Sequence, residues 1–170
     1  MRGSPGALSF YTGCDTIEAA CLPISSSNEK TPMPAEQGGA FFDTNVLLYL
    51  ASADEAKARR TETLLQSGGK TSVQVLNEIA SVARRKMALS WAETREFLML
   101  IRELLTVVSL TEEVHEVGLL IAERHRLAIY DGMIVAAALT SGCETLLSED
   151  MHHGLTIEQQ LTIRNPFVAL

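Results

Sequence analysis

Four carboxylates stand where an alternating strand–helix chain would bring side chains together: Asp43, Glu78, Asp131 and Asp150. Asp43 ends one short apolar run, and Asp150 closely follows another. Asp131 opens an apolar helix, and Glu78 lies one turn into the helix predicted after the second strand. Because ligands of open α/β sheets bind beyond the carboxyl ends of the strands, we expect these side chains to share one edge.

Gathering four carboxylates is electrostatically costly. Two unit charges about 4 Å apart repel by about 4 kcal/mol at an effective dielectric of about 20. The cluster therefore predicts a bound cation or the uptake of protons, and oxygen donors alone favour Mg²⁺ or Mn²⁺. Such a site could hold a phosphodiester and deliver a metal-activated water to phosphorus. Taken singly, each acid also fits an ordinary role as a helix cap, a loop residue or a solvated helix residue.

The elements that must position these acids alternate along the chain from Ala40 onward. Strands are predicted over 40–43, 71–73, 106–108, 144–147 and 161–163, and helices over 45–66, 74–87, 91–105, 112–126 and 132–141. Ser90 with Glu93 forms a capping-box pattern, Thr111 is a predicted N-cap, and Gly142 is a predicted C-cap. Strands alternating with helices predict an α/β fold with a central parallel sheet between two helical layers.

The first 39 residues differ from the rest in composition. They contain four of the five prolines and the run Ser25-Ser26-Ser27, without a sustained helical or strand period. We interpret residues 1–39 as a flexible N-terminal extension and residues 40–170 as the folded domain. A start at Met33 is an alternative for the true beginning of the protein.

Composition limits the function classes. The formal net charge is −7, which argues against a large RNA-binding surface but not against an RNA-cutting enzyme with bound metal. The three cysteines, Cys14, Cys21 and Cys143, form no CxxC pair and are predicted to be reduced thiols. No apolar run is long enough to suggest a spanning helix and no secretory signal is evident, so a cytoplasmic protein without membrane contact is predicted.

Four local motifs occur in the order and spacing of a known family. They are Phe42-Asp43-Thr44-Asn45, Ser72 to Glu78, Tyr130 to Ala138, and Leu146 to Met151. Together they resemble PIN domains, specifically the toxins of the VapC type, over about residues 40 to 170. The first motif alone would be a weak signal, whereas four motifs in order are a strong one.

The resemblance implies a three-layer α/β/α fold and an Mg²⁺- or Mn²⁺-dependent endoribonuclease. It further implies a toxin restrained by a cognate antitoxin, usually as a homodimer. Carried onto this chain, the metal-binding catalytic acids would be Asp43, Glu78, Asp131 and Asp150. Residues 40–170 would then be a PIN-like nuclease domain.

Neighbouring polar residues receive supporting roles from the same resemblance. Thr44 and Ser148 would be hydroxyls that orient a carboxylate or water, and Asn45 would be a structural amide beside the site. Glu149 adjoins Asp150 and could replace it as the fourth acid, although the motif favours Asp150.

Basic and apolar segments suggest where partners bind. Arg84, Arg85 and Lys86 form the densest basic cluster and are candidate RNA contacts; the alternative is a solvated helix end that complements the helix dipole. The cluster of Lys57, Arg59 and Arg60 is interpreted as plain surface. The apolar surface of residues 46–66 is predicted to bind an antitoxin peptide or another subunit.

Two other functions remain as alternatives. One is a binding module with a PIN fold whose acids no longer act. The other is a metal-dependent phosphatase, although phosphatases of the haloacid dehalogenase type need a second Asp where this chain has Asn45.

Overall fold

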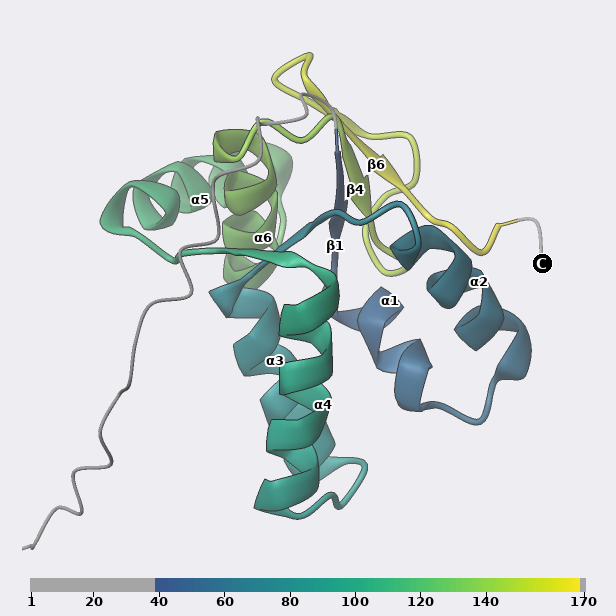
Figure 1. Ribbon diagram of the computed structural model, residues 1–170. Helices are drawn as coiled ribbons and strands as arrows, with labels where there is room; N and C mark the ends of the chain where they lie inside the picture. The colour runs from purple at the N-terminus through teal and green to yellow at the C-terminus, as the bar shows by residue number, and fades with distance from the viewer. Residues whose placement is uncertain (1–38, 169–170) are drawn as a thin grey trace, which may run out of the picture. The chain divides into compact units, whose positions relative to one another are not determined.

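The computed structural model describes residues 39–168, whose strands form one twisted mixed sheet (Figure 1). The strands are β1 (Ala40–Phe42), β2 (Lys70–Ser72), β3 (Thr106–Val108), β4 (Thr145–Leu147), β5 (Thr156–Ile157) and β6 (Leu161–Arg164). Their order across the sheet is β3-β2-β1-β4-β6-β5. All neighbours are parallel except β5, which runs antiparallel to β6 at the edge.

Helices cover both faces of this sheet, with α5 and α6 on one side and α2 on the other (Figure 1). The helical elements are α1 (Thr44–Leu48), the 3₁₀ turn η1 (Tyr49–Ala51), α2 (Glu55–Leu65), α3 (Val73–Arg85), α4 (Trp91–Leu104), α5 (Glu112–His125) and α6 (Ile129–Thr140). The predicted three-layer α/β/α arrangement is therefore confirmed. The antiparallel β5 strand is an addition to the parallel sheet that the sequence predicted.

Helix α6 is the central helix of its layer. Its residues 132–138 are all buried, because their small and apolar side chains pack against the sheet and against α5. Helices α5 and α6 approach each other closely at Gly118 and Gly132. A Cβ on Gly132 would lie 2.5 Å from the Gly118 carbonyl oxygen. This contact fixes the start of α6, and with it Asp131 in the first helical turn.

The predicted capping residues of three helices agree with the structure. Ser90 and Glu93 form a reciprocal capping box at α4, and the Thr111 hydroxyl accepts a hydrogen bond from the Val114 N–H at α5. Gly142 follows α6 with a φ of 74°, a conformation that favours glycine. Helix α6 begins at Ile129, before the predicted start at Gly132.

Some predictions fall on residues that the structure does not describe. The extension predicted over residues 1–39 lies outside the described residues apart from Gly39, as do Cys14 and Cys21. Cys143 is a buried free thiol. Between residues 39 and 168, no helix combines the length and apolar character needed to cross a membrane.

Candidate active site

The candidate site lies at the carboxyl ends of the central strands. Strand β1 lies between β2 and β4, so the strand order reverses beside it. The Asp43 N–H, just after β1, donates to the Leu147 carbonyl at the end of β4, with an N–O distance of 3.0 Å. Residues that follow β1 and β4 therefore meet at the point where open α/β sheets bind ligands.

Asp43 is the most buried acid of the site, with 4 % of its surface exposed. Its Oδ1 accepts a 2.6 Å hydrogen bond from the Thr44 N–H, and its Oδ2 accepts one of 2.6 Å from the Ser148 hydroxyl. Burial raises the pKa of Asp43 from 3.8 to about 6, against the lowering effect of these two hydrogen bonds. The charges of Glu78 and Asp131 contribute smaller parts of this rise, so both lie within electrostatic range.

Glu78 approaches Asp43 from helix α3, which packs against α1. Its Oε2 accepts a 2.9 Å hydrogen bond from the Thr44 hydroxyl, and its Oε1 accepts one of 2.9 Å from the Gln74 side-chain amide. The Ser72 hydroxyl caps α3 by accepting from the Val75 N–H, which anchors the helix at the end of β2. Thr44 thus contacts both acids, through its backbone and its side chain.

Asp131 and Asp150 complete the acidic group. Burial raises the pKa of Asp131, and the charges of Glu78 and Asp150 raise it further, while a hydrogen bond with the Ala128 backbone lowers it. Each of the four predicted acids therefore interacts electrostatically with at least one other. Within residues 39–168, however, no three Asp, Glu, His or Cys side chains lie close enough together to form a ready metal-ligand set.

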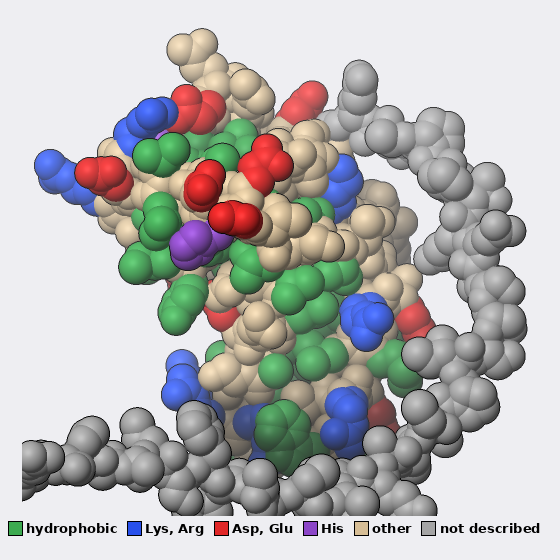
Figure 2. Space-filling view, turned by 90° about the vertical axis from the view of Figure 1, so that its left-hand side faces the viewer, with side chains coloured by type: hydrophobic (Ala, Val, Ile, Leu, Met, Phe, Trp, Pro, Cys, Tyr) green, Lys and Arg blue, Asp and Glu red, His purple; other side chains and the backbone are tan. Residues whose placement is uncertain are grey.

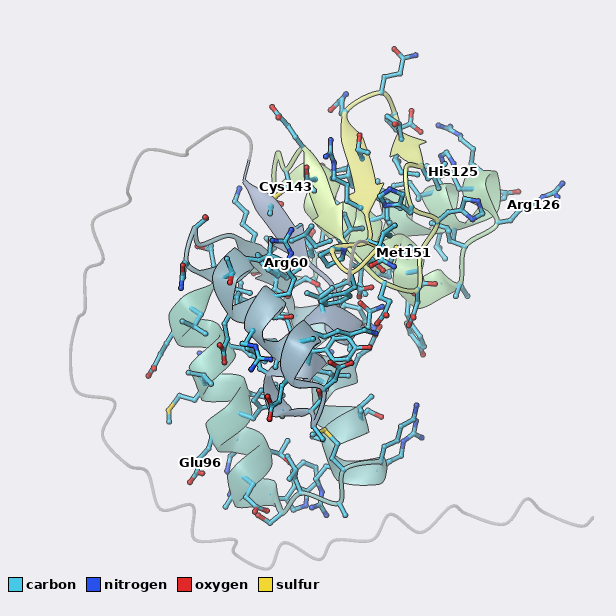
Figure 3. All side chains as sticks on the ribbon, turned by 90° about the vertical axis from the view of Figure 1, so that its right-hand side faces the viewer. Arg60, Glu96, His125, Arg126, Cys143 and Met151 are labelled. Carbon is cyan, nitrogen blue, oxygen red and sulfur yellow. The ribbon has the colours of Figure 1, made fainter. Side chains whose placement is uncertain are left out.

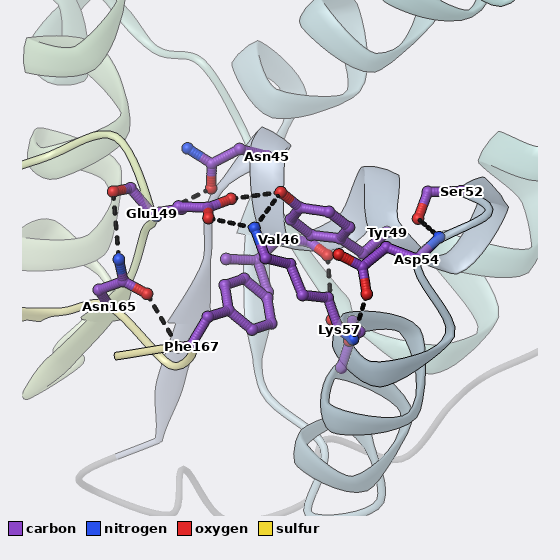
Figure 4. Close-up of polar contacts among 10 residues, drawn as sticks. Asn45, Val46, Tyr49, Ser52, Asp54, Lys57, Glu149, Asn165 and Phe167 are labelled. Carbon is purple, nitrogen blue, oxygen red and sulfur yellow. Dashed lines mark hydrogen bonds and ion pairs between the residues drawn. The ribbon is translucent and has the colours of Figure 1, made fainter. Parts of the chain in front are cut away.

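Glu149 belongs to a polar network with Tyr49 and Lys57 (Figure 4). Its carboxylate accepts a 2.5 Å hydrogen bond from the Tyr49 hydroxyl and forms an ion pair with Lys57. Burial alone would raise the pKa of Glu149, but the hydrogen bonds from Lys57 and Tyr49 lower it overall. Asp150, rather than Glu149, interacts with Asp131.

The same network fixes the backbone beside Asp150. The Glu149 N–H donates to the Asn45 side-chain oxygen at 3.1 Å, and the Asn165 amide donates to the Glu149 carbonyl at 3.4 Å. Lys57 also lies 4.5 Å from the centre of the Tyr49 ring. The interpretation of Lys57 as plain surface is therefore wrong, because its partners come from distant parts of the chain and no local pattern marks them.

The basic residues proposed to contact RNA differ in their surroundings. The Arg84 guanidinium donates to the Leu89 carbonyl and lies 4.7 Å from the centre of the Trp91 ring, so it holds the α3–α4 turn. Arg85 and Lys86 are exposed. Figure 2 shows several Lys and Arg side chains at the lower end of one face, apart from the acidic side chains above.

The fold and these acids define an α/β/α protein with carboxylates gathered where the strand order reverses. Residues 40–153 match the model of the PIN domain family. Because the match spans more than half of the chain, the protein belongs to the PIN domain family.

Solved structures share the fold at low sequence identity. A toxin–antitoxin complex from Klebsiella pneumoniae has a TM-score of 0.57 and 18 % identity, with 75 % of this chain and 98 % of that chain covered. VapC20 of Mycobacterium tuberculosis, a toxin that cleaves the sarcin–ricin loop, has a TM-score of 0.55 and 21 % identity over 65 % and 89 % of the two chains. FitAcB from Neisseria gonorrhoeae has a TM-score of 0.55 and 17 % identity over 76 % and 99 %. No curated protein sequence matches this chain significantly.

Proposed function

We propose that this protein is a divalent-metal-dependent endoribonuclease and the toxin of a toxin–antitoxin pair. The observation that carries the proposal is the buried carboxylate of Asp43, which lies within electrostatic range of Glu78 and Asp131 and has a pKa raised to about 6. A protein gains nothing in stability from such a group, since its charge is disfavoured in the folded state. A role in binding a cation accounts for it.

The donor set fits Mg²⁺ or Mn²⁺. The four acids offer only carboxylate oxygens, which these hard ions prefer. A bound cation would offset the burial and the repulsion that together raise the pKa of Asp43 and Asp131. We propose that Asp43, Glu78, Asp131 and Asp150 hold the ion. When bound, it would supply an activated water and offset the charge of a phosphodiester.

The surrounding residues would keep the acids in place. The Ser148 hydroxyl holds Asp43, and the Thr44 hydroxyl holds Glu78. Asn45 fixes the backbone just before Asp150 by accepting the Glu149 N–H. The position where a haloacid dehalogenase phosphatase would need a second Asp thus has a structural amide, which argues against that alternative.

The proposed partners are RNA, a cognate antitoxin and a second copy of the chain. The solved structure from Klebsiella pneumoniae that shares this fold is a toxin–antitoxin complex, which supports an antitoxin partner. An apolar groove with Leu50 and Leu65 on one wall and Leu100 and Leu104 on the other offers a contact surface. It includes part of the segment 46–66, for which the sequence predicts a protein partner.

A cleavage assay tests the proposal. Purified protein is incubated with single-stranded RNA while Mg²⁺ or Mn²⁺ is titrated, with EDTA as the metal-free reference. Cleavage should require the metal and fall by at least about a hundredfold in Asp43→Asn and Asp131→Asn, while the exposed Glu96→Gln variant keeps its rate. Wild-type rates in both Asn variants would refute the assignment, and metal-independent cleavage would refute the cofactor.

A further inference from the structure

A cleft of about 480 Å³ lies between α2 and the sheet face formed by β1, β4 and β6. Ala40 and Leu147 belong to its sheet wall, and Arg60, Arg164 and His153 supply its charged or ionisable lining. Figure 3 shows Arg60 on α2, close to the sheet. The cleft is distinct from the acidic site, since none of the four acids lines it.

The charged side chains that line the cleft are positive, although the protein as a whole is acidic. Two arginines line it, and no Asp or Glu does among the described residues, although the net charge of the chain is −7. Neither Arg60 nor Arg164 forms an ion pair within residues 39–168, whereas Arg59 pairs with Glu55. A concave surface of one sign focuses its field and attracts ligands of the opposite sign.

The ionisable side chains of the cleft supply hydrogen-bond donors to it. Among the described residues, the Arg60 side chain makes one hydrogen bond, a 3.4 Å contact from Nε to the Pro166 carbonyl, and its terminal nitrogens are left for a ligand. His153 Nδ1 accepts a 3.0 Å hydrogen bond from the Asn165 N–H, so the neutral ring carries its proton on Nε2. Guanidinium donors match phosphate oxygens in paired hydrogen bonds.

The cleft adjoins the acidic site through the backbone. The Ser148 N–H donates to the Arg164 carbonyl at 3.0 Å, and the Asn165 amide donates to the Glu149 carbonyl at 3.4 Å. The segment that contains Asp150 therefore continues to His153, which lines the cleft. We expect a strand of nucleic acid held at the acids to run along this segment toward the cleft.

We propose that the cleft between Arg60 and Arg164 binds backbone phosphates of the RNA strand beside the bond that is cut. This inference rests on the proposed function and adds to it a substrate-binding surface outside the acids. The contacts would be to phosphate, so the cleft should bind RNA strands of different sequence equally.

Binding of a labelled 12-nucleotide single-stranded RNA in EDTA tests the inference without cleavage. The full-length wild type is compared with Arg60→Gln, Arg164→Gln and the double variant across a range of salt concentrations. The double variant should bind about tenfold more weakly at low salt. The plot of log affinity against log salt should become shallower: the magnitude of its negative slope should decrease by about 1.4, or about 0.7 for each lost phosphate contact. Arg59→Gln is the matched control, because it removes the same charge from the neighbouring position of α2.

The outcomes separate this inference from the proposed function. A double variant with wild-type affinity and salt slope would overturn the cleft assignment, even where the wild type cleaves RNA. The inference would also be overturned, in favour of an acidic protein partner, if the double variant lost binding to a polyglutamate peptide while its RNA binding stayed unchanged. Absence of metal-dependent cleavage, together with a double variant that loses RNA binding, would instead refute the catalytic proposal and keep the cleft.

Discussion

Replacing Asp43 with Asn should stabilise the metal-free protein while it removes activity. Asp43 is almost fully buried, and its pKa is about 6 in the folded protein against 3.8 ordinarily. Between these values the folded state binds more protons than the unfolded chain, so stability falls as the pH rises from about 4 to about 6. Above that window the buried charge has its full cost, which an uncharged Asn avoids.

The magnitude follows from the pKa. A rise from 3.8 to about 6 corresponds to about 3 kcal/mol at neutral pH, since one pKa unit equals about 1.4 kcal/mol. Asn keeps an acceptor for the Thr44 N–H but presents an amide to the Ser148 hydroxyl, which must then accept instead of donating. This rearrangement costs about 1 kcal/mol. The net gain should be about 2 kcal/mol, or about 6 °C in melting temperature.

Thermal denaturation in EDTA at pH 7.5 and pH 4.5 measures this gain. Asp43→Asn should melt above the wild type at pH 7.5, and the difference should shrink at pH 4.5, where the wild-type carboxyl is largely protonated. Glu96→Gln, an exposed change of the same kind on α4, should shift neither melting temperature appreciably. A less stable Asn variant at pH 7.5, or an equal gain at both pH values, would refute the reasoning.

Three further substitutions probe the elements that hold the site. Gly132→Ala puts a Cβ 2.5 Å from a carbonyl oxygen of α5, so it should lower the free energy of unfolding, measured by urea denaturation, by about 2 kcal/mol or more. The control Gly39→Ala meets no atom within 4 Å and should leave the free energy of unfolding unchanged. Lys57→Met breaks the ion pair that holds the loop before Asp150 and should lower kcat about tenfold without changing RNA affinity; an unchanged kcat would contradict this role. Ser148→Ala removes a buried hydrogen bond and should lower stability in EDTA by about 1 kcal/mol, so a variant as stable as the wild type would argue against that bond.

Local patterns were sufficient to predict most elements of the fold. The capping residues Ser90 and Thr111 determine where α4 and α5 begin through contacts within one helical turn, so their signals are visible in the sequence. Strand β5 was not predicted, because its two residues acquire strand geometry only by pairing with β6. A two-residue segment has no periodicity of its own to reveal it.

The sequence predicted which acids come within electrostatic range of one another, but it did not decide between the adjacent Glu149 and Asp150. The sequence left Glu149 and Asp150 both open as the fourth acid, since both follow the same strand. The structure separates them through Lys57 and Tyr49, whose side chains engage Glu149 across long sequence distances. Such contacts depend on how α2 packs against the loop after β4, which no local pattern specifies.

The central claim is that the gathered acids share one divalent cation. Isothermal titration of Mn²⁺ into the metal-free wild type, Asp43→Asn and Asp131→Asn tests it most directly, with Glu96→Gln as the control. The account predicts that the wild type and the control bind Mn²⁺ alike, and that each Asn substitution weakens binding by at least about tenfold. Equal Mn²⁺ affinity in all four proteins, or no Mn²⁺ binding by the wild type, would contradict it.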